Sequence, residues 1–304
     1  MYEMYKSDDE GKTDEYQQGI DLLIPRMSRA DCEKIRNDID TMQRIALPSI
    51  MDLLEKGIES SRGGKKITLF RGLEESQLKE RSVKLSYQHR MHPDISKFPR
   101  EHIYNNEALK DSYGIESKRT LHFNRYSNTR SILIDVRPTE NLTKGGENPF
   151  EVEKMFEELD QIMEWTKKNP KKEGAWTIAL LTFYRGQESL IKSKLNKKLN
   201  MNKGRYFDLK ASHNLEIQIG TVDRFQGHEA DFVILSFVRS IKHNKGVGFL
   251  DNRSRLNVAI TRARYALVVL ADKSLFIRSK KKLLLRDFIN SLKDEIRYGD
   301  KNGN

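Results

Sequence analysis

Three polar clusters lie beside apolar runs of the sequence, and together they contain residue types that can grip a nucleotide. They are LSYQHRMHPDISKFP (85–99), IGTVDRFQGHEADFVILSFVRS (219–240) and GFLDNRSRLNVAITRARYALVVLAD (248–272). Arg90 and Arg262 supply planar cations that suit phosphate oxygens, and Glu229 supplies a carboxylate that can accept a hydrogen bond. We expect these three residues along one rim of a sheet, where they can hold a triphosphate and a ribose.

The elements that must position these residues follow from residue 83 onward, where apolar runs alternate with helical stretches. Strands are predicted at 83–87, 131–136, 176–183, 216–222, 231–238 and 265–272, with helices over 149–167 and 185–197. Nearly continuous Val, Ile and Leu runs between helices indicate parallel strands buried on both faces. The sequence therefore predicts a doubly wound α/β domain, whose ligands lie at the carboxyl ends of the strands.

The first 80 residues have a different composition. Residues 1–20 are polar and acidic and are expected to form a loop, whereas 28–60 have helical periodicity and 67–70 is a short strand candidate. We therefore divide the chain into a connecting segment or helical insertion (1–80) and an α/β domain (81–300).

Composition narrows the choice of partners and compartment. The formal net charge of +11 favours a polyanionic partner such as nucleic acid. Cys32 is the single cysteine, which excludes an intrachain disulfide and argues against a structural zinc site. No apolar run approaches the roughly 20 residues of a membrane helix, and the first residues lack the pattern of a signal peptide. We therefore expect an intracellular protein with no membrane partner, assigned to the cytoplasm with the nucleus left open.

The three clusters resemble the Q-Y-R-M-H-P, T-V-D-x-F-Q-G-x-E-x-D and R-L-N-V-A-x-T-R-A-R motifs of superfamily 1B helicases of the senataxin and nonsense-mediated-decay type. They occur in the family's order and spacing, over roughly residues 80–275. The resemblance implies a RecA-like second motor domain of an ATP-dependent 5′-to-3′ helicase or translocase. ATP with Mg²⁺ would bind in the full enzyme, with the Mg²⁺ ligands on the first motor domain.

The resemblance also implies roles for individual residues. Arg90 and Arg262 match two arginines that reach the γ-phosphate of ATP held by the other motor domain, where they stabilise developing charge. Glu229 matches the residue that hydrogen-bonds the ribose. Gly227 allows close approach of the backbone, and Gln226 beside it is counted with the nucleotide-binding candidates.

Four further candidates concern a single strand of DNA or RNA. Thr182 and Thr221 match threonines that contact the nucleic-acid backbone, since hydroxyl and backbone N–H groups suit phosphate oxygens. Tyr184 follows the predicted strand 176–183, and Arg239 follows the predicted strand 231–238. These two residues complete the set of nucleic-acid candidates.

Simpler structural explanations stay open for several of these residues. Arg90 can form a surface ion pair with Asp94, and either Arg262 or its neighbour Arg264 can be structural. The remaining alternatives are a turn cap at Glu229, an ordinary strand position at Thr221, and a turn-shaping role for His92 and Pro93.

The sequence departs from the family at two places. His89 replaces a tyrosine that can pack near adenine, so a stacking role there has less apolar area. Thr182-Phe183-Tyr184 lacks the proline of the family's T-P-Y, although Gln187 keeps its spacing. Asn148 and Glu151 fit the family's N-x-x-E at a helix start, which predicts a capping arrangement.

A phosphate-binding loop of the form G-x-x-x-x-G-K-[ST] is missing from the chain. Gly11-Lys12-Thr13 imitates its tail, but Lys6 stands where the first glycine is required. Two other stretches, 14–17 and 19–25, imitate helicase motifs without the required strand or glutamine. We expect a truncation that lacks the first motor domain, with a non-catalytic nucleic-acid-binding or regulatory module as the alternative.

Overall fold

The computed structural model describes residues 73–81, 85–104, 109–138, 146–241, 247, 250, 252–278 and 283–298. The chain divides into two compact units, Met1–Leu85 and Ser86–Asn304. In the first unit the described part contains helix α6 (Glu75–Arg81). The predicted helices at 28–60 and the predicted strand at 67–70 lie outside the described residues, and the assignment of 1–80 as a connecting segment stays a prediction.

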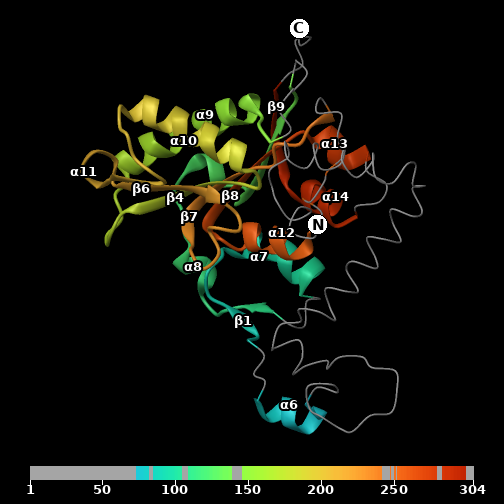
Figure 1. Ribbon diagram of the computed structural model, residues 1–304. Coiled ribbons are helices and arrows are strands. Elements are labelled where there is room, and N and C mark those ends of the chain that lie inside the picture. Colours follow the sequence, from blue (N-terminus) through green and yellow to red (C-terminus); the bar gives the residue numbers. More distant parts are fainter. Residues whose placement is uncertain are drawn as a thin grey trace, which may run out of the picture. The chain divides into compact units, whose positions relative to one another are not determined.

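The second unit contains a seven-stranded sheet in the order β5-β6-β4-β7-β8-β3-β9 (Figure 1). All neighbouring strands are parallel except β5, which pairs antiparallel with β6 at one edge. The strands are β3 (Ser131–Val136), β4 (Trp176–Thr182), β5 (Tyr206–Leu209), β6 (Leu215–Thr221), β7 (Ala230–Ser236), β8 (Ala263–Ala271) and β9 (Lys293–Tyr298).

Alternating side chains of the central strands pack into two separate cores, one on each face of the sheet. In β7, Val233 and Leu235 belong to one core, whereas Phe232 and Ile234 belong to the other. This double burial explains why the strands read as continuous apolar runs. The predicted doubly wound, mostly parallel α/β fold is confirmed.

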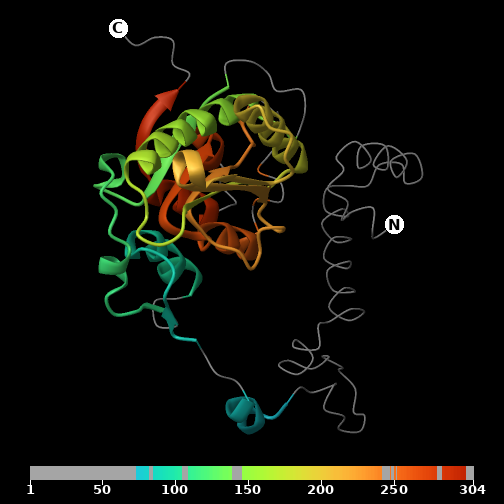
Figure 2. The ribbon, with the colours of Figure 1, turned by 90° about the vertical axis from the view of Figure 1, so that its left-hand side faces the viewer.

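Helices cover both faces of the sheet. α9 (Pro149–Lys168) and α10 (Arg185–Leu199) lie side by side over one face (Figure 2). The other face packs against α7 (Pro93–Phe98), α12 (Arg253–Ile260), α13 (Lys273–Arg278) and α14 (Leu283–Ser291). None of the helices in the described part of the chain is long and apolar enough to cross a membrane.

A small substructure precedes the main sheet. Its strands β1 (Tyr87–Gln88) and β2 (Lys110–Asp111) pair in parallel. Of the strand predicted at 83–87, only Tyr87 lies in β1. The other short elements are the π-helix η1 (Pro99–Ile103), α8 (Ile115–Lys118), the 3₁₀ helix η2 (Asn124–Tyr126) and α11 (Lys210–His213).

Candidate nucleotide and nucleic-acid sites

The residues predicted to act on ATP lie at the amino ends of two central strands. Glu229 immediately precedes β7, and Arg262 immediately precedes β8. The expectation of ligand groups at carboxyl ends is therefore wrong for these two residues, because the chain returns to the opposite edge before each strand begins. We call Arg90, Glu229, Arg262 and Arg264 the amino rim.

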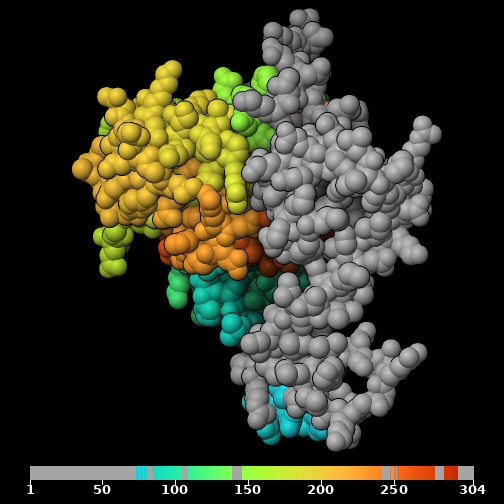
Figure 3. Space-filling model, viewed as in Figure 1, coloured from blue at the N-terminus to red at the C-terminus, as the bar shows by residue number. Residues whose placement is uncertain are grey.

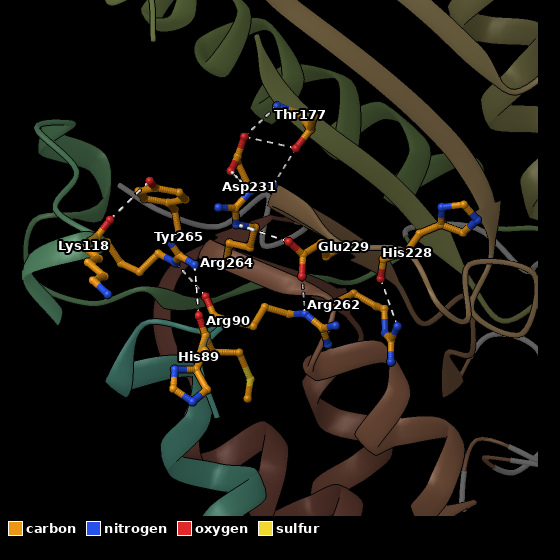
Figure 4. A network of polar contacts seen from close by, with 12 residues as sticks. His89, Arg90, Lys118, Thr177, His228, Glu229, Asp231, Arg262, Arg264 and Tyr265 are labelled. Atoms are coloured by element: carbon orange, nitrogen blue, oxygen red, sulfur yellow. Dashed lines mark hydrogen bonds and ion pairs between the residues drawn. The ribbon is translucent and has the colours of Figure 1, made fainter. Parts of the chain in front are cut away.

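Arg90 reaches the amino rim from the turn after β1. Its Nε donates to Glu229 Oε2 at 2.5 Å, and its NH1 donates to the Thr261 carbonyl at 2.9 Å (Figure 4). The turn is shaped by the buried amide of Gln88, whose Oε1 accepts from the backbone N–H of Arg90 at 2.9 Å. The alternative ion pair with Asp94 is not formed; Arg90 pairs with Glu229 instead.

Arg262 lies two residues after the end of α12, and within the described residues its side chain donates hydrogen bonds to backbone carbonyls alone. Its Nε donates to the Val258 carbonyl at 3.0 Å and its NH1 to the His228 carbonyl at 2.9 Å. Burial lowers the pKa of the Arg262 guanidinium, and the neighbouring charge of Arg90 lowers it further. Two cations that repel each other on one rim favour an anionic ligand between them.

Arg264 is held differently from Arg262, because it lies between two carboxylates. Its Nε is 3.6 Å from Glu229 Oε1, and its NH1 is 3.5 Å from Asp231 Oδ1 (Figure 4). Asp231 is fully buried and also accepts from the Thr177 backbone at 2.9 Å and from Lys171 Nζ at 2.6 Å. Arg264 is therefore neutralised inside the protein, whereas Arg262 has no carboxylate partner among the described residues.

Glu229 is ionised at neutral pH. Partial burial alone would raise its pKa, but the hydrogen bond and charge of Arg90, with the charges of Arg264 and Arg119, lower the pKa overall. The carboxylate can therefore accept a hydrogen bond from a hydroxyl group.

The remaining nucleotide candidates are exposed. His89, Gln226 and Gly227 all lie at the surface, and the His89 carbonyl accepts from Arg119 NH2 at 3.2 Å. Gly227 has φ +90°, a conformation that side chains other than glycine rarely adopt. The turn at Gly227 leads the chain to Glu229. The positive φ alone therefore accounts for a glycine at this position, and no bound ligand is needed to explain it.

The four predicted nucleic-acid residues gather at the opposite end of the strands. Thr182 and Thr221 are register partners at the ends of β4 and β6, and Tyr184 OH accepts from Arg239 Nε at 2.7 Å. The Arg239 guanidinium also lies over the Tyr184 ring, 4.9 Å from its centroid. All four side chains are buried. We call this group the carboxyl rim; a seven-residue strand separates it from the amino rim by roughly 20 Å.

Two exposed arginines at the carboxyl rim were missed by the sequence interpretation. Arg205 and Arg224 have side chains that are 55% and 46% exposed, and both pair with Glu188, which is 5% exposed. Glu188 lies in the first turn of α10, and Arg205 precedes β5. Arg224 occupies the variable position of the T-V-D-x-F-Q-G motif, so the motif did not indicate it as a functional residue. Glu188 and Arg205 belong to different elements, and no local sequence pattern indicates that they form a pair.

The segment 222–229 connects the two rims directly, since it runs from the end of β6 to the start of β7. Phe225 anchors it to the core, while Asp223 forms an ion pair with Arg255 at the start of α12. In the space-filling view, residues near 220–260 (orange) lie at the surface between the yellow region near 200 and the teal region near 90–100 (Figure 3). Within the segment, Asp223, Arg224 and residues 226–229 are exposed, whereas Val222 and Phe225 are buried.

Metal ligands are not grouped at either rim. Within the ranges that the structure describes, no cluster of three or more His, Cys, Asp or Glu side chains is arranged to hold a metal ion. The amino rim contains the guanidinium groups of Arg90 and Arg262 and the carboxylate of Glu229, which are the group types that bind phosphate oxygens and hydroxyl groups.

Comparison with known proteins gives a consistent set of relatives. A family model described as an AAA domain matches residues 65–274. The chain is 34% identical to helicase sen1 of Schizosaccharomyces pombe over 192 residues, covering 62% of this chain and 10% of that protein. It is 30% identical to the regulator of nonsense transcripts 1 homolog of Arabidopsis thaliana over 218 residues, covering 70% of this chain and 16% of that protein.

A longer alignment and one solved structure extend this comparison. ECM32 of Saccharomyces cerevisiae is 29% identical over 297 residues, which cover 85% of this chain and 26% of that protein. The chain thus spans about a quarter or less of the curated relatives it matches, with shares of 26%, 10% and 16%. The C-terminal domain of a possible DNA helicase from Lactobacillus plantarum WCFS1 matches with a TM-score of 0.38 and 16% identity, covering 69% of this chain and 99% of that one.

Proposed function

Since this chain belongs to the AAA-domain family of superfamily 1 helicases, we propose that it is the second motor domain of an ATP-dependent 5′-to-3′ helicase or translocase. The observation that carries this proposal is the amino rim: Arg90, Glu229 and Arg262 face the same edge, while the sequence has no phosphate-binding loop. A first motor domain is the proposed partner that holds ATP with Mg²⁺.

In this proposal the amino rim acts across the cleft between two motor domains. Arg262 donates its free N–H groups to the γ-phosphate, and Arg90 exchanges Glu229 for a phosphate oxygen as the cleft closes. Two guanidinium groups stabilise negative charge as the phosphoryl group is transferred. Glu229, released from Arg90, accepts from the ribose and keeps Arg264 as its partner. ATP supplies the bond whose hydrolysis drives opening of the cleft.

The carboxyl rim is the proposed grip on a single strand of DNA or RNA. Arg205 and Arg224 are exposed there and can pair with backbone phosphates, while Thr182 and Thr221 are buried at the ends of the adjoining strands β4 and β6. A net charge of +11 favours such a polyanion. We assign the enzyme to the cell interior, in the cytoplasm or nucleus, where its nucleic-acid substrates occur.

The purified chain is expected to bind single strands in a salt-sensitive manner and to hydrolyse ATP negligibly. The reason is that the residues on the amino rim act on phosphates that another domain must hold. Fluorescence anisotropy with a labelled oligonucleotide and a phosphate-release assay test the two parts. Substantial ATP hydrolysis by the chain alone contradicts the second-motor-domain proposal, and binding without any ATPase in the intact protein favours a non-catalytic binding module.

Replacing Arg224 by Ala is expected to weaken single-strand binding and to lower the slope of log affinity against log salt by about 0.7, the contribution of one phosphate contact to a single strand. Arg205→Ala should act in the same way, since both arginines share Glu188. Lys198→Ala is the matched control, because Lys198 pairs with Asp160 on the outer surface of α9. An unchanged salt slope in both arginine variants removes these residues from the proposed grip.

A further inference from the structure

The backbone after β7 contains a strained turn. Val238 has φ +68°, and the Arg239 N–H donates to the Phe237 carbonyl at 2.7 Å across it. This is a γ-turn of the rare kind with positive φ, and a β-branched residue is unfavourable there. The other described non-glycine residues with positive φ, Asn200 and Asn214, are of a type that adopts this region readily. Strain of this kind is of the order of 1–3 kcal/mol and persists only when surrounding groups impose it.

Two side chains from the start of α9 hold both backbone groups of Val238. Glu151 Oε2 accepts from the Val238 N–H at 2.9 Å, and Asn148 Nδ2 donates to the Val238 carbonyl at 3.0 Å. Asn148 also caps α9, because its Oδ1 accepts from the Glu151 N–H at 3.2 Å. The predicted capping arrangement is confirmed, but the same pair also clamps a distant turn.

Further buried groups fix this pair in place. Gln187 in α10 accepts from the Asn148 N–H at 2.7 Å and donates to its carbonyl at 3.1 Å, and it also donates to Ser236 Oγ at 2.9 Å. Ser236 at the end of β7 in turn donates to Glu151 Oε2 at 2.6 Å. Each of these four side chains is fully buried. The hydrogen bonds of this cluster thus connect α9, α10 and the end of β7 next to the turn at Val238.

The direction of the chain after the turn depends on this clamp. Arg239 turns back onto Tyr184 at the end of β4, and Ser240 donates to Asp272 Oδ2 at 2.6 Å at the end of β8. A relaxed, extended Val238 would send Arg239 in another direction. The turn at Val238 therefore places the buried Arg239 against Tyr184 in the carboxyl rim.

We propose that Glu151 and Asn148 are positioning residues that hold the strained turn at Val238 and so keep the buried Arg239 against Tyr184, which preserves the shape of the carboxyl rim for binding a nucleic-acid backbone. This inference rests on the proposed function of that rim. A carboxyl group is an unfavourable choice for a fully buried position, and burial raises the pKa of Glu151 to about 8. A helix cap alone does not require such a group, because exposed glutamates serve that purpose in capping boxes.

The test is a double-mutant cycle on the full chain, with a labelled single-stranded oligonucleotide as the probe. Glu151→Leu is expected to weaken binding roughly tenfold, equivalent to about 1.4 kcal/mol. In a Val238→Gly background the same substitution should weaken binding less than twofold, because glycine adopts positive φ without a clamp. Glu153→Gln, an exposed change in the same helix, is the matched control. If Glu151→Leu has equal effects in both backgrounds, the positioning role is overturned.

Hydrogen exchange gives a second readout that does not depend on nucleic acid. The Val238 amide should lose protection in Glu151→Leu, while amides in the centre of β7 keep theirs. If Glu151→Leu does not fold, Glu151→Gln replaces it, with a smaller loss of protection expected at the same amide. Retained protection at Val238 overturns the clamp. If the wild-type chain binds no single strand, the proposal that the carboxyl rim binds nucleic acid is overturned. The positioning role of the Val238 turn in that binding then falls with it, even if hydrogen exchange shows that Glu151 protects the Val238 amide.

Discussion

Replacing Arg262 by Ala in the proposed enzyme with two motor domains is expected to lower the rate of ATP hydrolysis at least about a thousandfold, the lower end of the effect of such arginines in GTPases. The side chain lies at the amino rim and donates only to the Val258 and His228 carbonyls within the described residues, so a positive charge remains available for phosphate. Single-strand binding should be retained, because the carboxyl rim lies at the other end of the strands. Steady-state phosphate release and anisotropy measure the two effects.

Two further variants distinguish the effect of the Arg262 charge and shape from a general effect of changing this region. Arg262→Lys keeps the charge but loses the planar fork, so an intermediate rate is expected. Arg253→Ala is the matched control, since Arg253 lies on the same helix α12 and also donates to backbone carbonyls, those of His102 and Ile103. Normal turnover in Arg262→Ala would remove this residue from catalysis.

Replacing Glu151 by Gln is expected to remove a large pH dependence of folding stability. Burial raises the pKa of Glu151 from 4.5 to about 8, against hydrogen bonds from Ser236 and Val238 that lower it. Between these two values the folded protein keeps a proton that the unfolded chain releases. The free energy of unfolding should therefore fall as pH rises from about 4.5 to 8, with a limiting slope of about 1.4 kcal/mol per pH unit.

Urea unfolding at several pH values between 5 and 9 measures this effect as the difference between wild type and Glu151→Gln. The difference should change steadily up to pH 8 and become constant above it. Glu153→Gln should run parallel to wild type, because its carboxyl group is exposed. Parallel curves for Glu151→Gln and wild type would show that the buried carboxyl group does not titrate in this range.

The sequence predicted the centre of the sheet well and its edges poorly. β3, β4, β6, β7 and β8 were predicted because burial on both faces requires continuous apolar runs. The edge strands β5 (YFDL) and β9 (KDEIRY) were missed, since each is short or rich in charged residues and pairs with a neighbour along only one side. Edge positions tolerate polar sequences that carry no strand pattern.

The predicted nucleotide-site residues lie close together in the structure, but their place on the sheet was predicted incorrectly. The motifs singled out Arg90 and Glu229, and the structure brings them into contact across 139 residues. The strands predicted at 231–238 and 265–272 already placed Glu229 and Arg262 before them; the error lay in applying the general rule that ligands lie at the carboxyl ends of strands. Arg205 and Glu188 were missed for a different reason: they meet only through the antiparallel pairing of β5 with β6.

The short segment 222–229 has a thermodynamic consequence. It covalently joins Thr221 at one end of the sheet to Glu229 at the other. In the proposed function, a nucleotide that draws Glu229 away from Arg90 therefore acts on the residues proposed to border the single strand. Any factor by which it changes the affinity for the strand must equal the factor by which the strand changes the affinity for the nucleotide. For typical couplings of about 1–3 kcal/mol this reciprocal factor is roughly 5 to 150, and it is the same free energy whichever ligand is titrated.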